Sequence, residues 1–175
     1  MSTRFRLYCR RCTYKRVADL GPVFTFPVVY RKILETAESG KLGEDLQRFV
    51  AEHPEGVLNC ETVLVTCRKC FRLQTAPDLS MFLPKRPDVR PPAGIRPVSF
   101  RYDKIPPAEP IPREDYALFQ RYEYTCRKCK EKMRTIHEQT LRKAFAKYGL
   151  RDPVPSLICP ECEKPLYFAG MEFVD

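Results

Sequence analysis

Apolar residues, many of them β-branched or aromatic, gather among polar ones at four places in the chain, and each of these stretches leads into a C-x-x-C motif. The stretches read RFRLYCRRCTYKRV, VLVTCRKCFRLQT, YEYTCRKCKEKMRT and SLICPECEKPLYFAG. A period of two with β-branched and aromatic residues is typical of strands. In the first, second and fourth stretches similar residues also follow the cysteines. Each motif is therefore predicted to lie at the tip of a short β hairpin.

Between the first and second motifs the apolar period becomes helical. VVYRKILETAESG and GEDLQRFVAEHPEG are predicted to form two helices, a helical insert at about residues 28–53, with Gly40 ending the first. Val29, Ile33 and Ala37 are expected to form the apolar face of the first helix, and Leu46, Phe49 and Val50 that of the second.

The second half of the chain begins with a proline-rich stretch. Residues 84–112 hold nine prolines, a density that excludes a helix and predicts a semi-rigid extended connector. A further helix is predicted over residues 135–148, with Thr135 and Glu138 as a capping box and Gly149 as its stop.

Cysteine usage predicts metal binding. Eight of the nine cysteines form the C-x-x-C pairs, and only Cys60 is left over. No apolar leader segment is visible, so we expect a soluble, cytoplasmic protein whose thiols stay reduced. Four such pairs supply ligands for two tetrahedral four-cysteine sites, each holding one Zn²⁺. Neither Cys60 nor the two histidines, His53 and His137, are expected to be ligands.

The four pairs can be grouped in two ways, sequentially or cross-braced. Sequential grouping places the 84–112 connector between two compact modules, whereas cross-bracing would thread it between closely spaced sites. The prediction is therefore an α+β protein with two small zinc-ribbon modules, at residues 1–83 and 113–175. Site 1 is predicted to hold Cys9, Cys12, Cys67 and Cys70, and site 2 Cys126, Cys129, Cys159 and Cys162.

The charge of the chain indicates a polyanionic partner. The formal net charge is +9, and two zinc tetrathiolates of −2 each would reduce it to about +5. Basic residues cluster around the first and third motifs, with tyrosines such as Tyr8, Tyr14, Tyr122 and Tyr124 among them. The candidate nucleic-acid contacts are Arg4, Arg6, Arg10, Arg11, Lys15, Arg16, Arg127, Lys128, Lys130, Lys132 and Arg134. The alternative is that these side chains are solvated and only compensate the charge of the metal sites.

Catalysis is not expected. The chain has no G-x-S-x-G, P-loop, H-E-x-x-H or dinucleotide-binding motif, and no P-C-x-x-C of the kind that zinc deaminases carry, since Pro160 lies inside the fourth pair and not before it. Four thiolates per zinc leave no open coordination position. Redox use of the C-x-x-C pairs is disfavoured because their flanks are strand-like.

The hairpins with paired cysteines resemble the zinc ribbons of transcription and translation factors and of RNA polymerase subunits. CPECEKPLYF is similar to the rubredoxin knuckle, with Glu163 in place of its usual glycine, so iron is an alternative metal at site 2. The N-terminal half, with GPVFTFPVVYRKI, GKLGEDLQRFVAEHPEGVL, CRKC and DLSMFLPK, resembles a set of uncharacterised bacterial zinc-ribbon proteins. That resemblance implies a ribbon with a helical insert and assigns no particular activity to the chain.

The sequence therefore predicts a non-catalytic zinc-binding protein that binds DNA or RNA through basic zinc knuckles. The alternative is a protein–protein adaptor or regulatory subunit with purely structural zinc sites. We expect neither a membrane nor a small-molecule substrate as partner.

Overall fold

The computed structural model describes residues 2–22, 27–59, 61–90 and 111–174. The chain is a mixed α+β protein in which most strands are antiparallel, which confirms the predicted class. It divides into two compact units. Unit 1 comprises Met1–Val23, Thr62–Ala76 and Glu123–Asp175, and unit 2 comprises Phe24–Glu61 and Pro77–Tyr122. This division differs from the predicted modules, because unit 1 combines the two ends of the chain with one inner segment.

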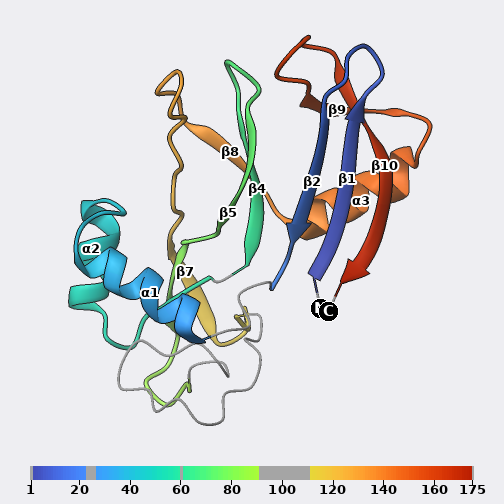
Figure 1. Cartoon of the computed structure of the whole chain (residues 1–175). Helices are drawn as coiled ribbons and strands as arrows, with labels where there is room; N and C mark the ends of the chain where they lie inside the picture. Colours follow the sequence, from blue (N-terminus) through green and yellow to red (C-terminus); the bar gives the residue numbers. More distant parts are fainter. Residues whose placement is uncertain (1, 23–26, 60, 91–110, 175) are drawn as a thin grey trace. The chain divides into compact units, whose positions relative to one another are not determined.

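The larger sheet of unit 1 joins the N-terminal and C-terminal strands (Figure 1). Its four strands are β1 (Ser2–Cys9), β2 (Lys15–Leu20), β9 (Pro153–Ile158) and β10 (Pro165–Val174), in the order β2-β1-β10-β9. β1 and β10 pair antiparallel over their whole length, from Ser2 opposite Val174 to Cys9 opposite Leu166. Cys9, the last residue of β1, therefore lies beside the start of β10.

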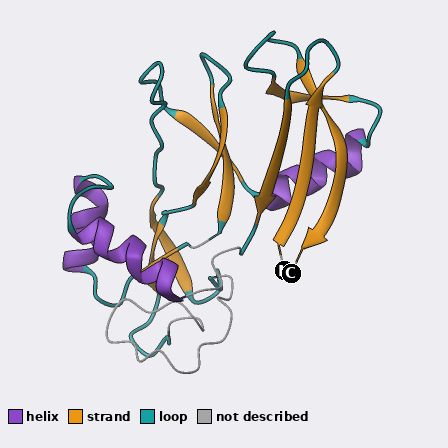
Figure 2. Cartoon of the chain, viewed as in Figure 1, coloured by secondary structure: helices purple, strands orange, loops and turns teal. Residues whose placement is uncertain are grey.

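Helix α3 (Glu138–Tyr148) lies against one face of this sheet (Figure 2). Its buried Leu141 contacts a core that includes Phe5, Leu7 and Phe168, each at most 1% exposed. The sequence pattern explains this arrangement, since alternate residues of β1 and β10 point to the same face of the sheet.

A second sheet of unit 1 holds the middle of the chain. It consists of β4 (Thr62–Cys67), β5 (Leu73–Pro77) and β8 (Met133–Ile136), in the order β5-β4-β8. β4 is buried on both faces: Leu64 joins the core under α3, whereas Val63 and Val65 join a second cluster beside the cysteines. A strand buried on both faces reads as a continuous apolar run, which VLVTC does.

Unit 2 is the helical insert with its own small sheet. Helices α1 (Pro27–Glu38) and α2 (Glu44–Glu52) accompany β3 (Val57–Leu58), β6 (Met81–Pro84) and β7 (Tyr116–Gln120), in the order β3-β6-β7. The core of this unit includes Tyr30, Leu34, Ala37, Leu46, Phe49, Leu58, Leu79, Met81 and Tyr116.

The predicted helices are present, but two details differ. In α1, Tyr30 and Leu34 are buried with Ala37, whereas the predicted Ile33 is only partly buried. In α3, the N-cap is His137, and Thr135 belongs to β8, so the predicted capping box does not form. Pairing of β8 with β4 places Thr135 opposite Val65 and takes the position that a cap would need.

The proline-rich stretch does not link the units that the structure shows. β6 ends at Pro84, and β7, which begins shortly after the stretch, is its antiparallel neighbour in unit 2. The Lys85 N–H donates to Asp115 O at 2.8 Å. Both flanks therefore lie in one unit, and the remainder, residues 91–110, is outside the described ranges.

The core of unit 1 predicts how two phenylalanines of β10 should differ. Phe168→Ala should lower the free energy of unfolding by about 3–5 kcal/mol, because Phe168 is fully buried and packs edge-on against Phe145. Phe173→Ala, at an exposed position of the same strand, should change it by less than about 1 kcal/mol. Urea denaturation of the metal-loaded protein measures both, and equal losses would contradict this core.

Candidate metal centres

Each C-x-x-C motif forms the same backbone turn. The N–H of the first cysteine donates to the carbonyl oxygen five residues on, which belongs to Tyr14, Arg72, Glu131 or Lys164, at 2.8–3.0 Å. We call residues 9–14, 67–72, 126–131 and 159–164 the knuckle turns. In three of them an N–H two residues after the first cysteine also points to its Sγ: Arg11, Lys69 and Glu161, at 3.4–3.5 Å. The predicted hairpin tips are therefore present.

Three knuckle turns use the left-handed backbone conformation without glycine. The residue after the second cysteine has φ of 56° at Phe71, 61° at Lys130 and 59° at Glu163. In each of these turns its N–H donates to the carbonyl oxygen of the first cysteine at 2.8–3.1 Å. Residues with a Cβ are disfavoured in this conformation, so a glycine would suit each of these positions better.

The turns bring the eight cysteines together as two clusters. The terminal site holds Cys9, Cys12, Cys159 and Cys162, and the central site holds Cys67, Cys70, Cys126 and Cys129, with the ligand atoms of each within 4.8 Å of one another. In both sites the first cysteine of each pair is buried and the second is half-buried. Among the described residues, no histidine joins either cluster.

This grouping corrects the sequential one predicted from the sequence. The first pair joins the fourth and the second joins the third, so the sites are nested along the chain. The physical reason is strand pairing: β1 against β10 carries Cys9 to the turn after β9, and β4 against β8 sets Cys67 opposite Met133. The two TCRKC copies, predicted to bind different metals, share one site.

The spacing of the sulfur atoms suits a tetrahedral metal ion. In the terminal site Cys9 Sγ lies 3.4 Å from Cys162 Sγ, and Cys12 Sγ lies 3.6 Å from Cys159 Sγ. In the central site the corresponding distances are 3.2 Å for Cys67–Cys129 and 3.6 Å for Cys70–Cys126. A tetrahedron with metal–sulfur bonds of about 2.3 Å has edges of about 3.8 Å. All eight are free thiols, so the clusters could hold metal ions.

The turns also favour the thiolate form of Cys9 in the terminal site and of Cys67 and Cys126 in the central site, because the pKa of each is lowered. Burial opposes ionisation of Cys9, but hydrogen bonds from the Arg11 N–H and the Cys162 thiol outweigh it and lower the pKa of Cys9 to about 7. At Cys126, the N–H of Cys129 is the main cause that lowers the pKa to about 6. Because the thiolate is the metal ligand, these turns prepare the sites for metal near neutral pH.

The structure separates the basic residues predicted as nucleic-acid contacts into two groups. Five of them contact other parts of unit 1: Arg4 pairs with Asp19, Arg6 with Glu172 and Lys132 with Glu123, Arg134 donates to Ser156 O, and Arg10 lies 4.0 Å above the Tyr167 ring. In the described part of the chain, no ion pair engages the other six, which are Arg11, Lys15, Arg16, Arg127, Lys128 and Lys130.

The tyrosines predicted for base stacking are also divided. Tyr122 belongs to unit 2, where its hydroxyl donates to Leu42 O at 2.9 Å. Tyr124 packs beside the central site, and Tyr8 lies against Tyr167 with ring centroids 5.8 Å apart. Tyr14 lines a hollow that is described below.

Sequence reasoning missed the basic residues of the second knuckle turn. The predicted contacts did not include Arg68, Lys69 and Arg72. The five residues TCRKC at 66–70 are nevertheless identical to those at 125–129, in and around the third turn. That repeat was the signal that could have identified them. His53 lies in unit 2 against Phe49 and Phe119, and Cys60 is outside the described residues.

Comparisons with known proteins do not test the family resemblances inferred from the sequence, and these stay predictions. No family model, curated protein or solved structure matches the chain. Among the described helices, none is both long enough and apolar enough to cross a membrane.

Nested grouping predicts which thiols a single substitution should expose. Cys126→Ser should release the central metal and make Cys67, Cys70 and Cys129 reactive, while Cys159 and Cys162 stay protected with Cys9 and Cys12. Alkylation under native conditions, mapped by mass spectrometry, measures this. Exposure of Cys159 and Cys162 instead would restore the sequential grouping; Cys60→Ser is the control and should release no metal.

The left-handed residues predict a stabilising substitution. Glu163→Gly should raise the free energy of unfolding by about 1 kcal/mol, because glycine removes the Cβ strain at φ 59°. Thr13→Gly is the matched control, since Thr13 follows the second cysteine of the first turn and is not among the described residues with positive φ. It should lower stability by about 0.5–1 kcal/mol. Urea denaturation distinguishes the two, and destabilisation by both would contradict the strain argument.

Proposed function

We propose that both four-cysteine clusters bind zinc and that the zinc is structural. Tetrahedral thiolate sets are the usual structural zinc sites, and four protein ligands leave the metal no position for substrate. On this proposal the protein has no catalytic activity of its own. Iron remains the alternative metal at the cluster that contains Cys159 and Cys162, because thiolate tetrahedra accept either ion.

Elemental analysis of the untagged protein should give two zinc ions per chain. Thiol modification should release both ions, and a zinc indicator follows that release. Iron content with visible thiolate-to-iron absorption would contradict zinc, and fewer than two metal ions of any kind would contradict the sites.

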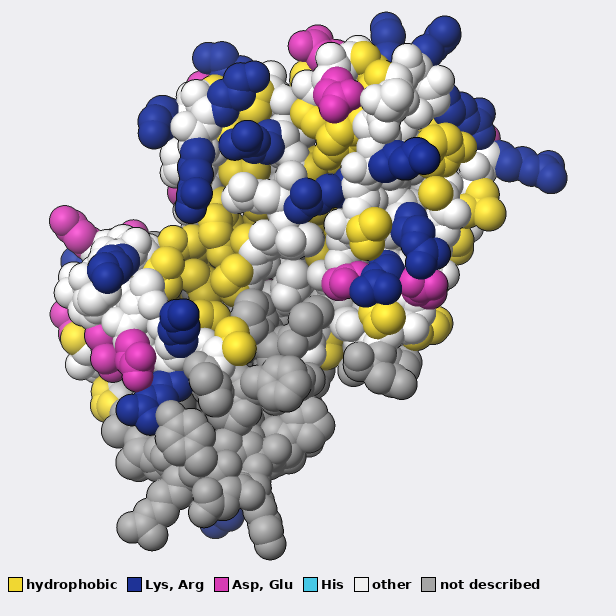
Figure 3. Space-filling model, viewed as in Figure 1, with side chains coloured by type: hydrophobic (Ala, Val, Ile, Leu, Met, Phe, Trp, Pro, Cys, Tyr) yellow, Lys and Arg dark blue, Asp and Glu magenta, His cyan; other side chains and the backbone are white. Residues whose placement is uncertain are grey.

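We further propose that unit 1 binds single-stranded nucleic acid through the four knuckle turns. The observation that carries this proposal is the position of the turns, which all lie at one end of unit 1 (Figure 1). Lys and Arg side chains gather over that end on the face shown in Figure 3. We call the four turns together with residues 15 and 16 the knuckle end.

The charge of the knuckle end supports this proposal. It contains eleven Lys or Arg residues and three acidic residues, Glu131, Glu161 and Glu163. Two zinc tetrathiolates of −2 each would reduce its excess from eight positive charges to about four. A positive surface of this kind attracts the phosphate backbone, and its neutralisation releases counterions.

Salt dependence tests this proposal. The combined variant Arg11→Gln, Arg127→Gln and Lys130→Gln should make the log–log salt slope of oligonucleotide binding shallower by about two, since each single-strand phosphate contact contributes about −0.7. The control variant removes three exposed charges of unit 2, by Lys41→Gln, Arg113→Gln and Arg121→Gln, and should leave the slope unchanged. Fluorescence anisotropy at several salt concentrations measures both.

Failure of the unsubstituted protein to bind DNA or RNA at low salt would favour the second candidate, a protein–protein adaptor with structural zinc sites. The observation that favours an adaptor is on β7 in unit 2, where Leu118 and Phe119 are 45% and 50% exposed. Equal slopes for the two triple variants would likewise contradict binding through the knuckle turns.

A further inference from the structure

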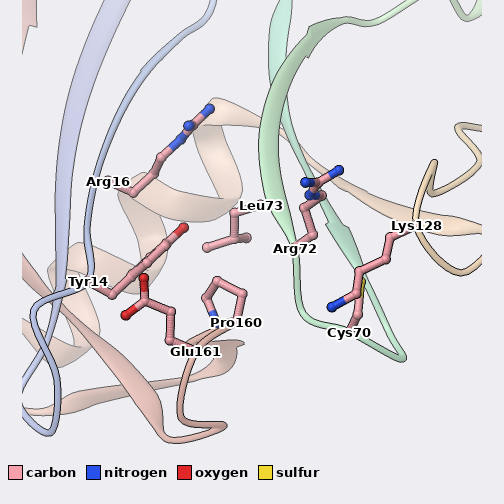
Figure 4. A pocket seen from close by; sticks show the side chains of 8 residues that line it. All are labelled: Tyr14, Arg16, Cys70, Arg72, Leu73, Lys128, Pro160 and Glu161. Atoms are coloured by element: carbon pink, nitrogen blue, oxygen red, sulfur yellow. The ribbon is translucent and has the colours of Figure 1, made fainter.

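A hollow of about 320 Å³ lies within unit 1 between the turns of the two metal sites (Figure 4). One side is formed by the β1–β2 hairpin and the fourth turn, and the other by the second and third turns. The lining residues are Tyr14, Arg16, Pro160 and Glu161 on the first side, and Cys70, Arg72, Leu73 and Lys128 on the second.

Three cations and one acid line this hollow. Arg16, Arg72 and Lys128 line it with Glu161, and no ion pair between any of them is present in the described part of the chain. In Figure 4 the Lys128 amine points from the second side toward the middle of the hollow. The hollow therefore has an excess of positive charge that favours an anionic group.

Arg16 is placed as a ligand-binding residue rather than as a solvated charge. In β2 it shares the inward face with Ala18 and Leu20, which are buried in the core. Its Nε is buried and has no hydrogen-bond partner among the described residues. Nε itself is enclosed by protein, so an anion in the hollow would accept from the terminal Nη1 and Nη2 groups of the half-buried Arg16.

Compensation of the metal sites is the alternative explanation of this charge. Cys70 lines the hollow, so Lys128 and Arg72 on its side can offset the charge of the central site. Arg16 stands on the opposite side, and the described residues that line the hollow include no cysteine of the terminal site. Pro160 and Glu161 on its side lie between Cys159 and Cys162, so Arg16 can offset the charge of the terminal site and of Glu161.

The rest of the lining is suited to an aromatic base. Tyr14 is half-buried and its ring faces the hollow beside Pro160, with the buried Leu73 near the centre (Figure 4). Bases stack on aromatic side chains without regard to sequence. The volume is at the lower end of small-molecule sites, about 300–1,000 Å³, and would take one nucleotide rather than a base pair.

We propose that this hollow binds a single nucleotide unit, with its phosphate on Arg16 and Arg72 and its base against Tyr14. The inference rests on the proposed function in one respect, namely that the nucleotide belongs to a strand held by the knuckle end. A free nucleotide offers the same chemistry, so the experiment below distinguishes the two sources.

The first arm of the test uses uridine 5′-monophosphate and two-dimensional NMR of the zinc-loaded protein. Titration should shift the amides of Tyr14, Leu73 and Glu161, whereas uridine or inorganic phosphate alone should bind at least tenfold more weakly. Arg16→Gln and Arg72→Gln should each weaken the nucleotide tenfold or more. Arg113→Gln, an equal change of charge at an exposed position of unit 2, should change it less than twofold.

The second arm measures a labelled oligouridylate by anisotropy. Tyr14→Leu should weaken the strand about tenfold through lost stacking, and Tyr14→Phe, which keeps the ring, should weaken it less than twofold. Metal content is measured for every variant. If Tyr14→Leu loses metal, weaker oligouridylate binding by Arg16→Gln tests the hollow in its place.

The outcomes separate the inference from the proposed function. Strand binding that depends on the knuckle-turn charges, without amide shifts in the hollow, would overturn the inference and leave the proposed function standing. Nucleotide binding in the hollow without strand binding would support the inference with a free nucleotide as the source, and would overturn the proposed function. If the protein binds neither the nucleotide nor the strand, the inference and the proposed function are both overturned.

Discussion

The antiparallel pairing of β1 with β10 is the contact on which the rest of unit 1 depends. It joins the first strand of the chain to the last over Ser2–Cys9 and Pro165–Val174, and it buries Phe5 and Phe168 in one core with α3. It also fixes the partners of the first cysteine pair, because Cys9 ends β1 opposite Leu166. The terminal site is thus a consequence of the sheet, and a metal bound there would in turn hold both strands together at one end.

The entropy of loop closure explains why cysteines so far apart in the sequence can share one site. The terminal site joins residues about 150 positions apart, and the central site joins residues about 60 apart. The entropy of closing a loop grows only with the logarithm of its length, so the nested arrangement costs about 1 kcal/mol more than a sequential one. Eight residues of strand pairing and a buried core offset that difference easily. Nesting also sets all four knuckle turns at one end of a single unit, where their charges can act together.

The sequence predicted the local structure well and the long-range arrangement badly. Alternation and C-x-x-C spacing identified the turns and all eight clustered cysteines, and helical periodicity located α1, α2 and α3 to within three residues. The grouping failed because it used distance along the chain, whereas strand register decides it. Two signals were overlooked. VLVTC is apolar without alternation, as expected of β4 buried on both faces, and Arg16 stands at an inward position of β2, which only the structure identifies as the edge of a hollow.

Nested grouping is the central claim, and cadmium NMR tests it most directly. Replacement of the bound metal by ¹¹³Cd gives one resonance per site, and scalar couplings correlate each ion with the β protons of its own cysteines. The account predicts one ion coupled to Cys9, Cys12, Cys159 and Cys162 and another coupled to Cys67, Cys70, Cys126 and Cys129. A single ion coupled to both Cys9 and Cys67 would contradict it.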